Sequence, residues 1–285
     1  MTAAPTPARA VRARLSRLVW TLCGLTVAGV WTFPVYWMAN TAFKPGRDMQ
    51  TVTPQFWPHH PTLANFRTVV TDAVFWRALR NSAIVTVLVV LVAMAVAFLA
   101  ALAIARFRFR GRRALLLAVM IVQMVPLNAV VIPLFLMFSA ARLSDTLPGL
   151  VLAYLAFAMP FAVWTLRGFL STIPVELEEA AMVDGCGRFG AFVRVVLPLL
   201  LPGLIATSIY TMILAWNEFM LTYFLISSPD NYTLPLWLTH FTLSEGTEYG
   251  PLMAGSTLIA LPVVVFFMLV QRKVAGGLTA GAVKG

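Results

Sequence analysis

Charged residues are scarce in this chain of 285 residues, where Asp, Glu, Lys and Arg together make up 11% and hydrophobic residues make up 60%. Ordinary soluble domains carry roughly 25% charged residues. A soluble fold of this composition would have to bury almost all of its surface, whereas a bilayer is itself an apolar solvent. The shortage of charge, with a mean hydropathy of +0.85, therefore indicates an integral membrane protein.

Cysteine and histidine are also rare, with two and three copies. Cys23 and Cys186 lie in segments of different polarity, and neither has a Cys or His partner at the spacing of a metal site. The histidines lie outside the hydrophobic runs, and these runs contain no aspartate; the histidines are His59, His60 and His240. This pattern argues against an intramembrane protease or acyltransferase. We expect no catalytic residue, no metal and no cofactor bound by this chain.

The phosphate-binding pattern G-x-x-x-x-G-K-[ST] is absent, so the chain cannot hydrolyse ATP by that route. Basic residues that alternate with aromatics occur only at 106–113, a short run that suits lipid headgroups at the membrane surface. Nucleic acid is therefore not an expected partner, whereas membrane lipid is.

Six hydrophobic runs are long enough to cross about 30 Å of hydrocarbon, which takes roughly 20 helical residues. They are 18–39, 82–105, 114–138, 148–166, 203–226 and 253–270. None shows the alternating polarity of a β-barrel strand. The predicted fold class is all-α, a polytopic membrane protein with six transmembrane helices.

Lys and Arg predict the orientation. With six spans, 15 of the 21 basic residues lie on the side that holds both termini, and the positive-inside rule makes that side the cytoplasm. The first run is too long for a signal peptide and has no small-residue cleavage site. We expect a cell-membrane protein with a cytoplasmic tail at 1–17, a six-helix transmembrane domain at 18–271 and a flexible, glycine-rich cytoplasmic tail at 272–285.

The segment 171–198 is the only long stretch of mixed polarity on the predicted inside. Pro174 suits the first turn of a helix, and the acidic residues behind it suit the positive end of the helix dipole. We predict a short helix at 175–183, an interruption at Gly185 and Gly187, and a second helix that Pro198 and Pro202 end. Such a compact knob is a docking element.

This segment also carries a specific motif. Its residues are Glu179, Ala180, Ala181, Gly185, Val195, Val196, Leu197 and Pro198. The motif resembles the EAA loop of membrane subunits of ATP-binding-cassette (ABC) importers, and it departs from that pattern only at Val195. The stretches 33–37, 43–45, 215–218 and 277–285 also resemble the carbohydrate branch of these importers, similar to the shorter membrane subunit of the maltose transporter. Stretches 34–46 and 181–186 look like actinobacterial permeases for chitobiose and related N-acetylglucosamine sugars.

The resemblance implies a type I ABC importer permease that moves a sugar or oligosaccharide of the chitobiose, maltose or trehalose type by alternating access. It implies four kinds of partner: a second homologous permease subunit, two ATPase subunits that hold ATP and Mg²⁺, an extracellular sugar-binding protein, and lipid. Residues implied in ATPase coupling are Glu179, Ala180, Ala181, Asp184, Gly185, Leu197 and Pro198, with Gly277, Leu278 and Thr279 reaching between the ATPase subunits. In the external loop 227–252, His240, Ser244, Glu245 and Gly246 are implied to enter the cleft of the binding protein.

Polar residues inside the hydrophobic runs are costly in a bilayer and therefore candidates for the pathway. They are Gln123, Asn128, Tyr154, Tyr210, Asn217 and Glu218. Such side chains also hold helices together, and for Glu218 a structural hydrogen-bonding role stays open. Two other functions stay open as well: an ion-driven secondary transporter and an ABC permease for glycerol-phosphate-type substrates. The external loop is either a functional loop or a solvated connection.

Overall fold

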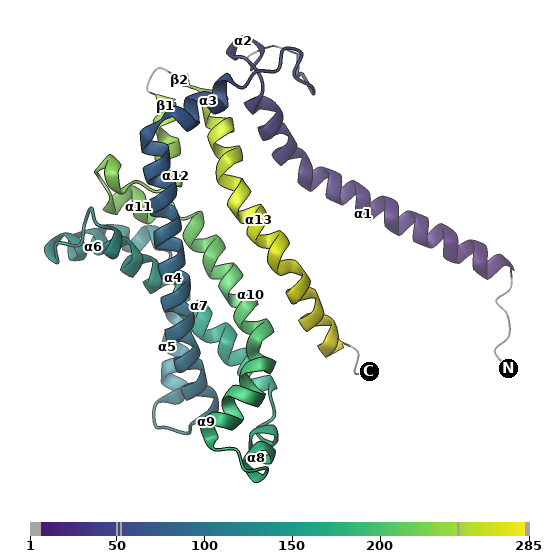
Figure 1. Ribbon diagram of the computed structural model, residues 1–285, viewed down its shortest axis with the longest axis vertical. Helices are drawn as coiled ribbons and strands as arrows, with labels where there is room; N and C mark the ends of the chain where they lie inside the picture. The colour runs from purple at the N-terminus through teal and green to yellow at the C-terminus, as the bar shows by residue number, and fades with distance from the viewer. Residues whose placement is uncertain (1–6, 50, 52, 244–245, 283–285) are drawn as a thin grey trace. The chain divides into compact units, whose positions relative to one another are not determined.

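The computed structural model describes the backbone of residues 7–49, 51, 53–243 and 246–282, and the side chains of 15–49, 51, 53–242 and 246–270. These residues form helices and one short hairpin (Figure 1). The chain divides into two compact units, described separately below. One unit comprises Met1–Thr71 with Phe241–Ile259, and the other comprises Asp72–His240 with Ala260–Gly285.

The first unit contains one long helix and several short elements. They are α1 (Pro7–Ala42), α2 (Gly46–Met49), α3 (Ala64–Thr71), the strands β1 (Thr242–Leu243) and β2 (Gly246–Thr247), and the beginning of α13 (Tyr249–Ala282). The Asn65 amide donates to the carbonyl oxygens of Ala42 and Lys44, both at 2.8 Å, and so fastens α3 to the end of α1. The buried Lys44 ammonium donates to the Gln55 carbonyl oxygen at 2.5 Å.

The second unit contains most of the apolar helices. In chain order they are α4 (Ala73–Arg106), α5 (Arg112–Met124), α6 (Leu127–Ala140), α7 (Leu147–Thr172), α8 (Glu176–Val183), α9 (Arg188–Ala191), the π-helical turn η1 (Phe192–Val196), α10 (Leu197–Trp216), α11 (Met220–Leu225), the 3-10 turn η2 (Pro229–Asn231), α12 (Leu234–Trp237) and the 3-10 turn η3 (Leu238–Phe241). Figure 1 shows α8 and α9 at one end of this unit and α11 and α12 at the other.

Helices α4, α7 and α10 form the core of this unit. On α4, Ala93, Ala97 and Ala101 recur every four residues and are fully buried, so they lie on one face. Small residues allow the close helix approach that membrane proteins use. Two of these alanines, Ala97 and Ala101, belong to one buried cluster with Leu166, Leu170, Val196 and Leu200.

Five described helices are long and apolar enough to cross a membrane: Leu15–Ala42, Ala73–Arg106, Leu147–Thr172, Arg188–Trp216 and Tyr249–Val270. The predicted runs 18–39, 82–105, 148–166 and 253–270 each fall inside one of them, so their helical structure is confirmed. Many of their large side chains are exposed in the isolated chain, as lipid and subunit contacts require.

The predictions for the third and fifth runs were wrong in one respect, because both runs are broken. Helices α5 and α6 meet at an angle of 99°. Pro126 has no N–H and disfavours the helical conformation of the preceding residue, and Val125 is extended, with ψ of 119°. In the fifth run, α10 ends at Trp216 and α11 begins at Met220.

The prediction that Pro198 and Pro202 end the helix of the docking segment was also wrong. The π-helical turn η1 leads directly into α10, and the Leu197 N–H donates to the Phe192 carbonyl oxygen, five residues back. A turn widened in this way accommodates the proline ring without ending the helix.

Helix is also present in the two segments predicted as cytoplasmic tails, including the C-terminal one predicted to be flexible. Helix α1 begins at Pro7, and α13 continues to Ala282 although its last turns contain several glycines. A formed helix gains a hydrogen bond with each added residue and avoids a new nucleation step. This gain offsets the cost of about 1 kcal/mol for each glycine.

Candidate coupling, translocation and binding-protein sites

The predicted docking segment forms two short helices at one end of the second unit. Helix α8 follows Pro174 and carries Glu176, Glu178 and Glu179 in its first turn, where the positive end of the helix dipole stabilises carboxylates. The prediction of a helix at 175–183 and a second helix near Phe189 is confirmed by α8 and α9.

Gly185 ends α8 in a left-handed conformation, with φ of 91°. The Cys186 N–H donates to the Ala181 carbonyl oxygen at 3.0 Å, and the Gly185 N–H donates to that of Met182 at 3.1 Å. These two bonds form a Schellman cap, which requires a residue that tolerates positive φ. The glycine of the motif therefore sets the sharp turn between α8 and α9.

The outer surface of the knob combines charge with exposed apolar side chains. Glu179, Ala180 and Asp184 are exposed, and Ala181 is half-buried. Beside them, Val183 is 87% exposed and Phe189 is 81% exposed. Apolar groups exposed around a charged group are typical of an interaction surface.

The end of the motif is anchored in the core instead. Leu197 is half-buried and Pro198 exposed, whereas the flanking Val196 and Leu200 are fully buried. The motif thus joins an outward-facing helix to a helix of the core. The other predicted coupling residues, Gly277, Leu278 and Thr279, lie in the helical backbone of α13, and their side chains are outside the described part.

A cavity of about 370 Å³ lies at the break between α10 and α11. Three of the predicted pathway residues, Tyr154, Asn217 and Glu218, line it together with Phe157 and other apolar side chains. The apolar wall with a few polar groups suits a small organic ligand.

A network of hydrogen bonds supports this cavity. The Tyr154 hydroxyl lies 3.2 Å from the Glu218 carbonyl oxygen, and Thr233 Oγ1 lies 3.3 Å from Thr222 Oγ1. The Glu218 carboxylate accepts a hydrogen bond from the Leu221 N–H and thereby caps α11. The Asn217 amide donates to the Ile213 carbonyl oxygen at 2.8 Å. These contacts connect α7, the α10–α11 break and the segment after α11.

The other three predicted pathway residues do not line this cavity. Gln123 lies in the last turn of α5, before the break, and Asn128 lies in the first turn of α6, after it; both are exposed. Tyr210 is 45% exposed and stacks on Phe161 with ring centroids 3.7 Å apart. Their assignment to the pathway stays a prediction.

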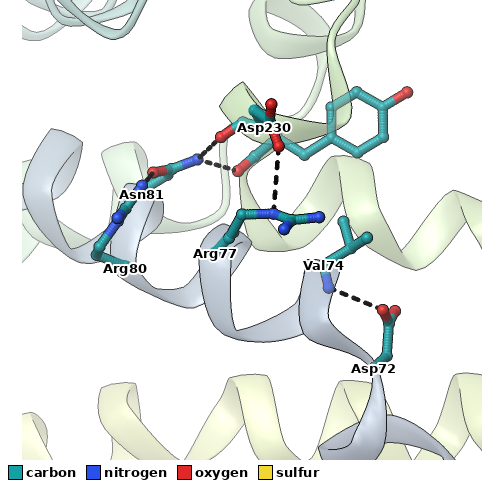
Figure 2. Close-up of polar contacts among 7 residues, drawn as sticks. Asp72, Val74, Arg77, Arg80, Asn81 and Asp230 are labelled. Atoms are coloured by element: carbon teal, nitrogen blue, oxygen red, sulfur yellow. Dashed lines mark hydrogen bonds and ion pairs between the residues drawn. The ribbon is translucent and has the colours of Figure 1, made fainter.

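The first part of the loop 227–252 is packed on α4. Figure 2 shows the Asn81 amide reaching the carbonyl oxygen of Asp230, at 2.8 Å. The same amide donates to the carbonyl oxygen of Tyr232 at 3.0 Å. Arg77 pairs with Asp230 at 3.3 Å, and the buried Trp237 donates from Nε1 to Asp72 at 2.7 Å. This part of the loop is therefore a fixed element and not a solvated connection.

Asp145, between α6 and α7, holds the same segment from a second side. Its carboxylate accepts from the backbone N–H groups of Ser227 and Ser228 and from the Ser228 hydroxyl. The Asn231 amide donates to its backbone oxygen at 2.6 Å. Burial raises the pKa of Asp145, but these hydrogen bonds outweigh burial and lower the pKa of its carboxyl group below the usual value.

The tip of the loop is a small antiparallel hairpin, with Thr242 opposite Thr247 and Leu243 opposite Gly246. Of the predicted binding-protein residues, Gly246 lies in β2, and the exposed His240 packs against Tyr232 with ring centroids 5.3 Å apart. Ser244 and Glu245 lie outside the described residues.

Several structural residues were missed from the sequence. Thr222 lies one helical turn after Glu218, a spacing that places two residues on one face, and this signal could have been used. Asp145 and the segment 227–231 are far apart in the chain, and no local pattern predicts their pairing.

Comparison with known proteins identifies the chain. The family described as "Binding-protein-dependent transport system inner membrane component" matches residues 93–279. The diacetylchitobiose uptake system permease protein DasC of Streptomyces coelicolor is 45% identical over 89% of this chain and 92% of its own length. The trehalose transport system permease protein SugB of Mycobacterium tuberculosis is 36% identical over 93% of this chain and 97% of its own length.

The fold has a solved counterpart in a bacterial ABC transporter that imports the acidic polysaccharide alginate. The TM-score is 0.74 at 20% identity, with 95% of this chain and 99% of the other covered. The predicted resemblance is thus confirmed, and an ion-driven transporter is excluded. The chain belongs to the binding-protein-dependent transport system inner membrane components, as a multi-pass permease subunit of an ABC importer that is not itself an enzyme.

Proposed function

We propose that this subunit forms half of the pore of an importer for a short oligosaccharide, with diacetylchitobiose ranked first and maltose- or trehalose-type sugars behind it. The observation that carries the proposal is the 45% identity to a permease named for diacetylchitobiose uptake. The more distant relative named for trehalose transport, at 36%, supports the second rank.

The proposed topology has six spans, with α5 and α6 acting as one bent span, and both termini in the cytoplasm. The permease domain is residues 18–271, between cytoplasmic segments 1–17 and 272–285. Support comes from the 15 of 21 basic residues on that side. A cysteine at Thr247 should react with an impermeant thiol reagent in intact cells, and one at Arg110 should react only after permeabilisation. Labelling of Arg110→Cys in intact cells would contradict this topology.

The proposed complex contains a second homologous permease subunit, two ATPase subunits and an extracellular sugar-binding protein. ATP and Mg²⁺ bind to the ATPase subunits, and no cofactor binds to this chain. The exposed apolar faces of the helices support a second membrane subunit. A solved alginate transporter with a similar fold, 16% identical, is in complex with its periplasmic protein.

Coupling runs through the loop 171–198 in this proposal. Glu179 pairs with a basic residue of the ATPase, and Ala180 and Ala181 allow close approach. Asp184, Gly185, Leu197 and Pro198 shape and anchor the knob, whose exposed Val183 and Phe189 support a docking role. The end of α13 at 277–279 reaches between the ATPase subunits. ATP binding then shifts the pore between inward-open and outward-open states.

The pathway and the loop complete the proposal. Tyr154, Asn217 and Glu218 line the pathway through the cavity at the α10–α11 break, and Gln123, Asn128 and Tyr210 face it from surfaces exposed in the isolated chain. The tip of the loop, with His240, Ser244, Glu245 and Gly246, enters the binding-protein cleft.

Uptake by cells tests the substrate. A strain that lacks this gene should lose uptake of radiolabelled diacetylchitobiose and regain it with the intact gene. Trehalose, maltose and glycerol 3-phosphate serve as competitors. Competition by trehalose or maltose alone would move the assignment to the second rank, and competition by glycerol 3-phosphate alone would contradict the sugar assignment.

A further inference from the structure

Arg106, the last residue of α4, joins three helices at the docking end of the second unit. Its guanidinium donates to the carbonyl oxygens of Leu170 at 3.3 Å and Ile173 at 3.2 Å, at the end of α7. Its Nε lies 2.6 Å from Glu178 Oε1, in the first turn of α8. One planar group thus contacts α7 and α8 together through three separate nitrogens, whereas a lysine ammonium has its donors on a single nitrogen.

This ion pair is sheltered from solvent, because the Arg106 side chain is 12% exposed and that of Glu178 is 20% exposed. Among the described residues, Arg106 Nε and Glu178 Oε1 have no hydrogen-bond partner besides this charge contact. The Arg77–Asp230 pair has side chains 42% and 79% exposed, so solvent screens it. Removal of one partner of the sheltered Arg106–Glu178 pair would therefore leave the other charge buried and uncompensated.

Neighbouring acidic residues on α8 point in different directions. Successive residues of a helix are turned by about 100°, so Glu178 faces α4 while Glu176 and Glu179 are exposed. The chain on either side of α8 contains Pro174 before it and the turn at Gly185 after it. Helix α8 packs on α9 and η1 beyond the turn at Gly185, and Arg106 adds the contact that ties it to α4 and α7.

Helix α4 carries this contact to the other end of the unit. It has 34 residues and is therefore about 51 Å long. At its first turns, Asn81 holds the backbone of Asp230 (Figure 2) and of Tyr232, and Asp72 accepts from Trp237. Figure 1 shows α8 near one end of α4 and α12 near the other.

We propose that Arg106 and Glu178 form a clasp that makes α8 and α4 move as one body, so that movement of the docking helix reaches the segment 229–237. The two are positioning residues, and the inference rests on the proposed coupling role of the loop 171–198. Without the clasp, α8 would still bind the ATPase through Glu179. Its movement would then be taken up by rotation of the backbone near Pro174 and Gly185 and would not reach α4.

Spin labels test the clasp in the assembled complex. Cys23 and Cys186 are replaced by serine, and labels are placed at the exposed positions Val183 and Phe109, on α8 and just beyond α4. We expect a narrow distance distribution in the parent, unchanged between the nucleotide-free and ATP-bound states, and a clearly broader one in Glu178→Ala. Glu176→Ala is the matched control, because it removes a carboxylate from the same turn of α8. Equal widths in the two variants would overturn the proposal.

Coupling is measured on the same variants. Glu178→Ala should keep its ATPase subunits through purification but import about fivefold to tenfold less substrate per ATP hydrolysed. Arg106→Lys should lie between this variant and the parent, because it keeps the charge and loses the fork. Unchanged import per ATP, or loss of the ATPase subunits from Glu178→Ala, would contradict the clasp. If the parent imported none of the tested sugars, the proposed substrate would fail, and the label distances would still decide the clasp.

Discussion

The hydroxyl groups of Tyr154 in α7 and Thr222 in α11 lie 2.5 Å apart, although 68 residues separate them in the chain. Tyr154 is buried beside the break that ends α10, and Thr222 is fully buried on the helix that follows it. Since a broken helix leaves backbone groups without their regular partners, the break needs contacts of this kind. The pair therefore fixes the position of α11 and, with it, one wall of the cavity.

Replacing Tyr154 by Phe tests this role. The ring should keep its packing, and Thr222 should lose its short hydrogen bond, so we expect a loss of about 1 kcal/mol in stability. The melting temperature of the purified complex is the measurement. Tyr210→Phe is the control, because its hydroxyl has no hydrogen bond to another described residue. An equal effect of both changes would contradict the role of the pair.

Gly185 and Gly187 provide a matched pair for the knob. An added Cβ meets no atom within 4 Å at either position, but φ is +91° at Gly185 and −67° at Gly187. Gly185→Ala should thus cost about 1–2 kcal/mol in the local conformation, and Gly187→Ala should not. We expect weaker retention of the ATPase subunits and reduced transport only for Gly185→Ala. Equal retention by both variants would show that the cap does not position the knob.

The sequence predicted the helices and the knob because both depend on local patterns. Long apolar runs, Pro174 before α8 and Gly185 after it are each signals within a few residues. The Arg106–Glu178 contact and the Asp145 cluster join residues far apart in the chain. Periodicity carries no information on such pairs.

The breaks in two helices had weaker signals. Pro126 is a local cue for the bend between α5 and α6, but a proline inside an apolar run is also compatible with one kinked helix. At the α10–α11 break, no proline is present between Trp216 and Met220. The break depends on the capping of α11 by Glu218 and on Tyr154 from another helix, which hydrophobicity does not predict.

Asp145 should give the protein a specific sensitivity to acid. Its pKa in the folded state is lowered from an ordinary value near 3.8. A lowered folded pKa contributes stability above the unfolded value, and this contribution is lost as the pH falls through the folded pKa. Below about pH 4, the melting temperature should therefore fall more steeply for the parent than for Asp145→Asn. The variant should be the less stable at neutral pH, and parallel curves would contradict this role of the carboxylate.

The hairpin formed by β1 and β2 is the part of the loop 227–252 proposed to act on the binding protein. Loops longer than a connection requires are commonly functional, and the segment before this hairpin is held by its own contacts to α4 and Asp145. Replacing residues 244–247 by two glycines should therefore leave assembly, docking and basal ATPase activity intact. Stimulation of the ATPase by the sugar-loaded binding protein should fall about tenfold. The control is Thr242→Ala, which keeps the length of the hairpin, and the readout is phosphate release with and without loaded binding protein. Full stimulation after the shortening would show that the hairpin only connects two segments and does not act on the binding protein.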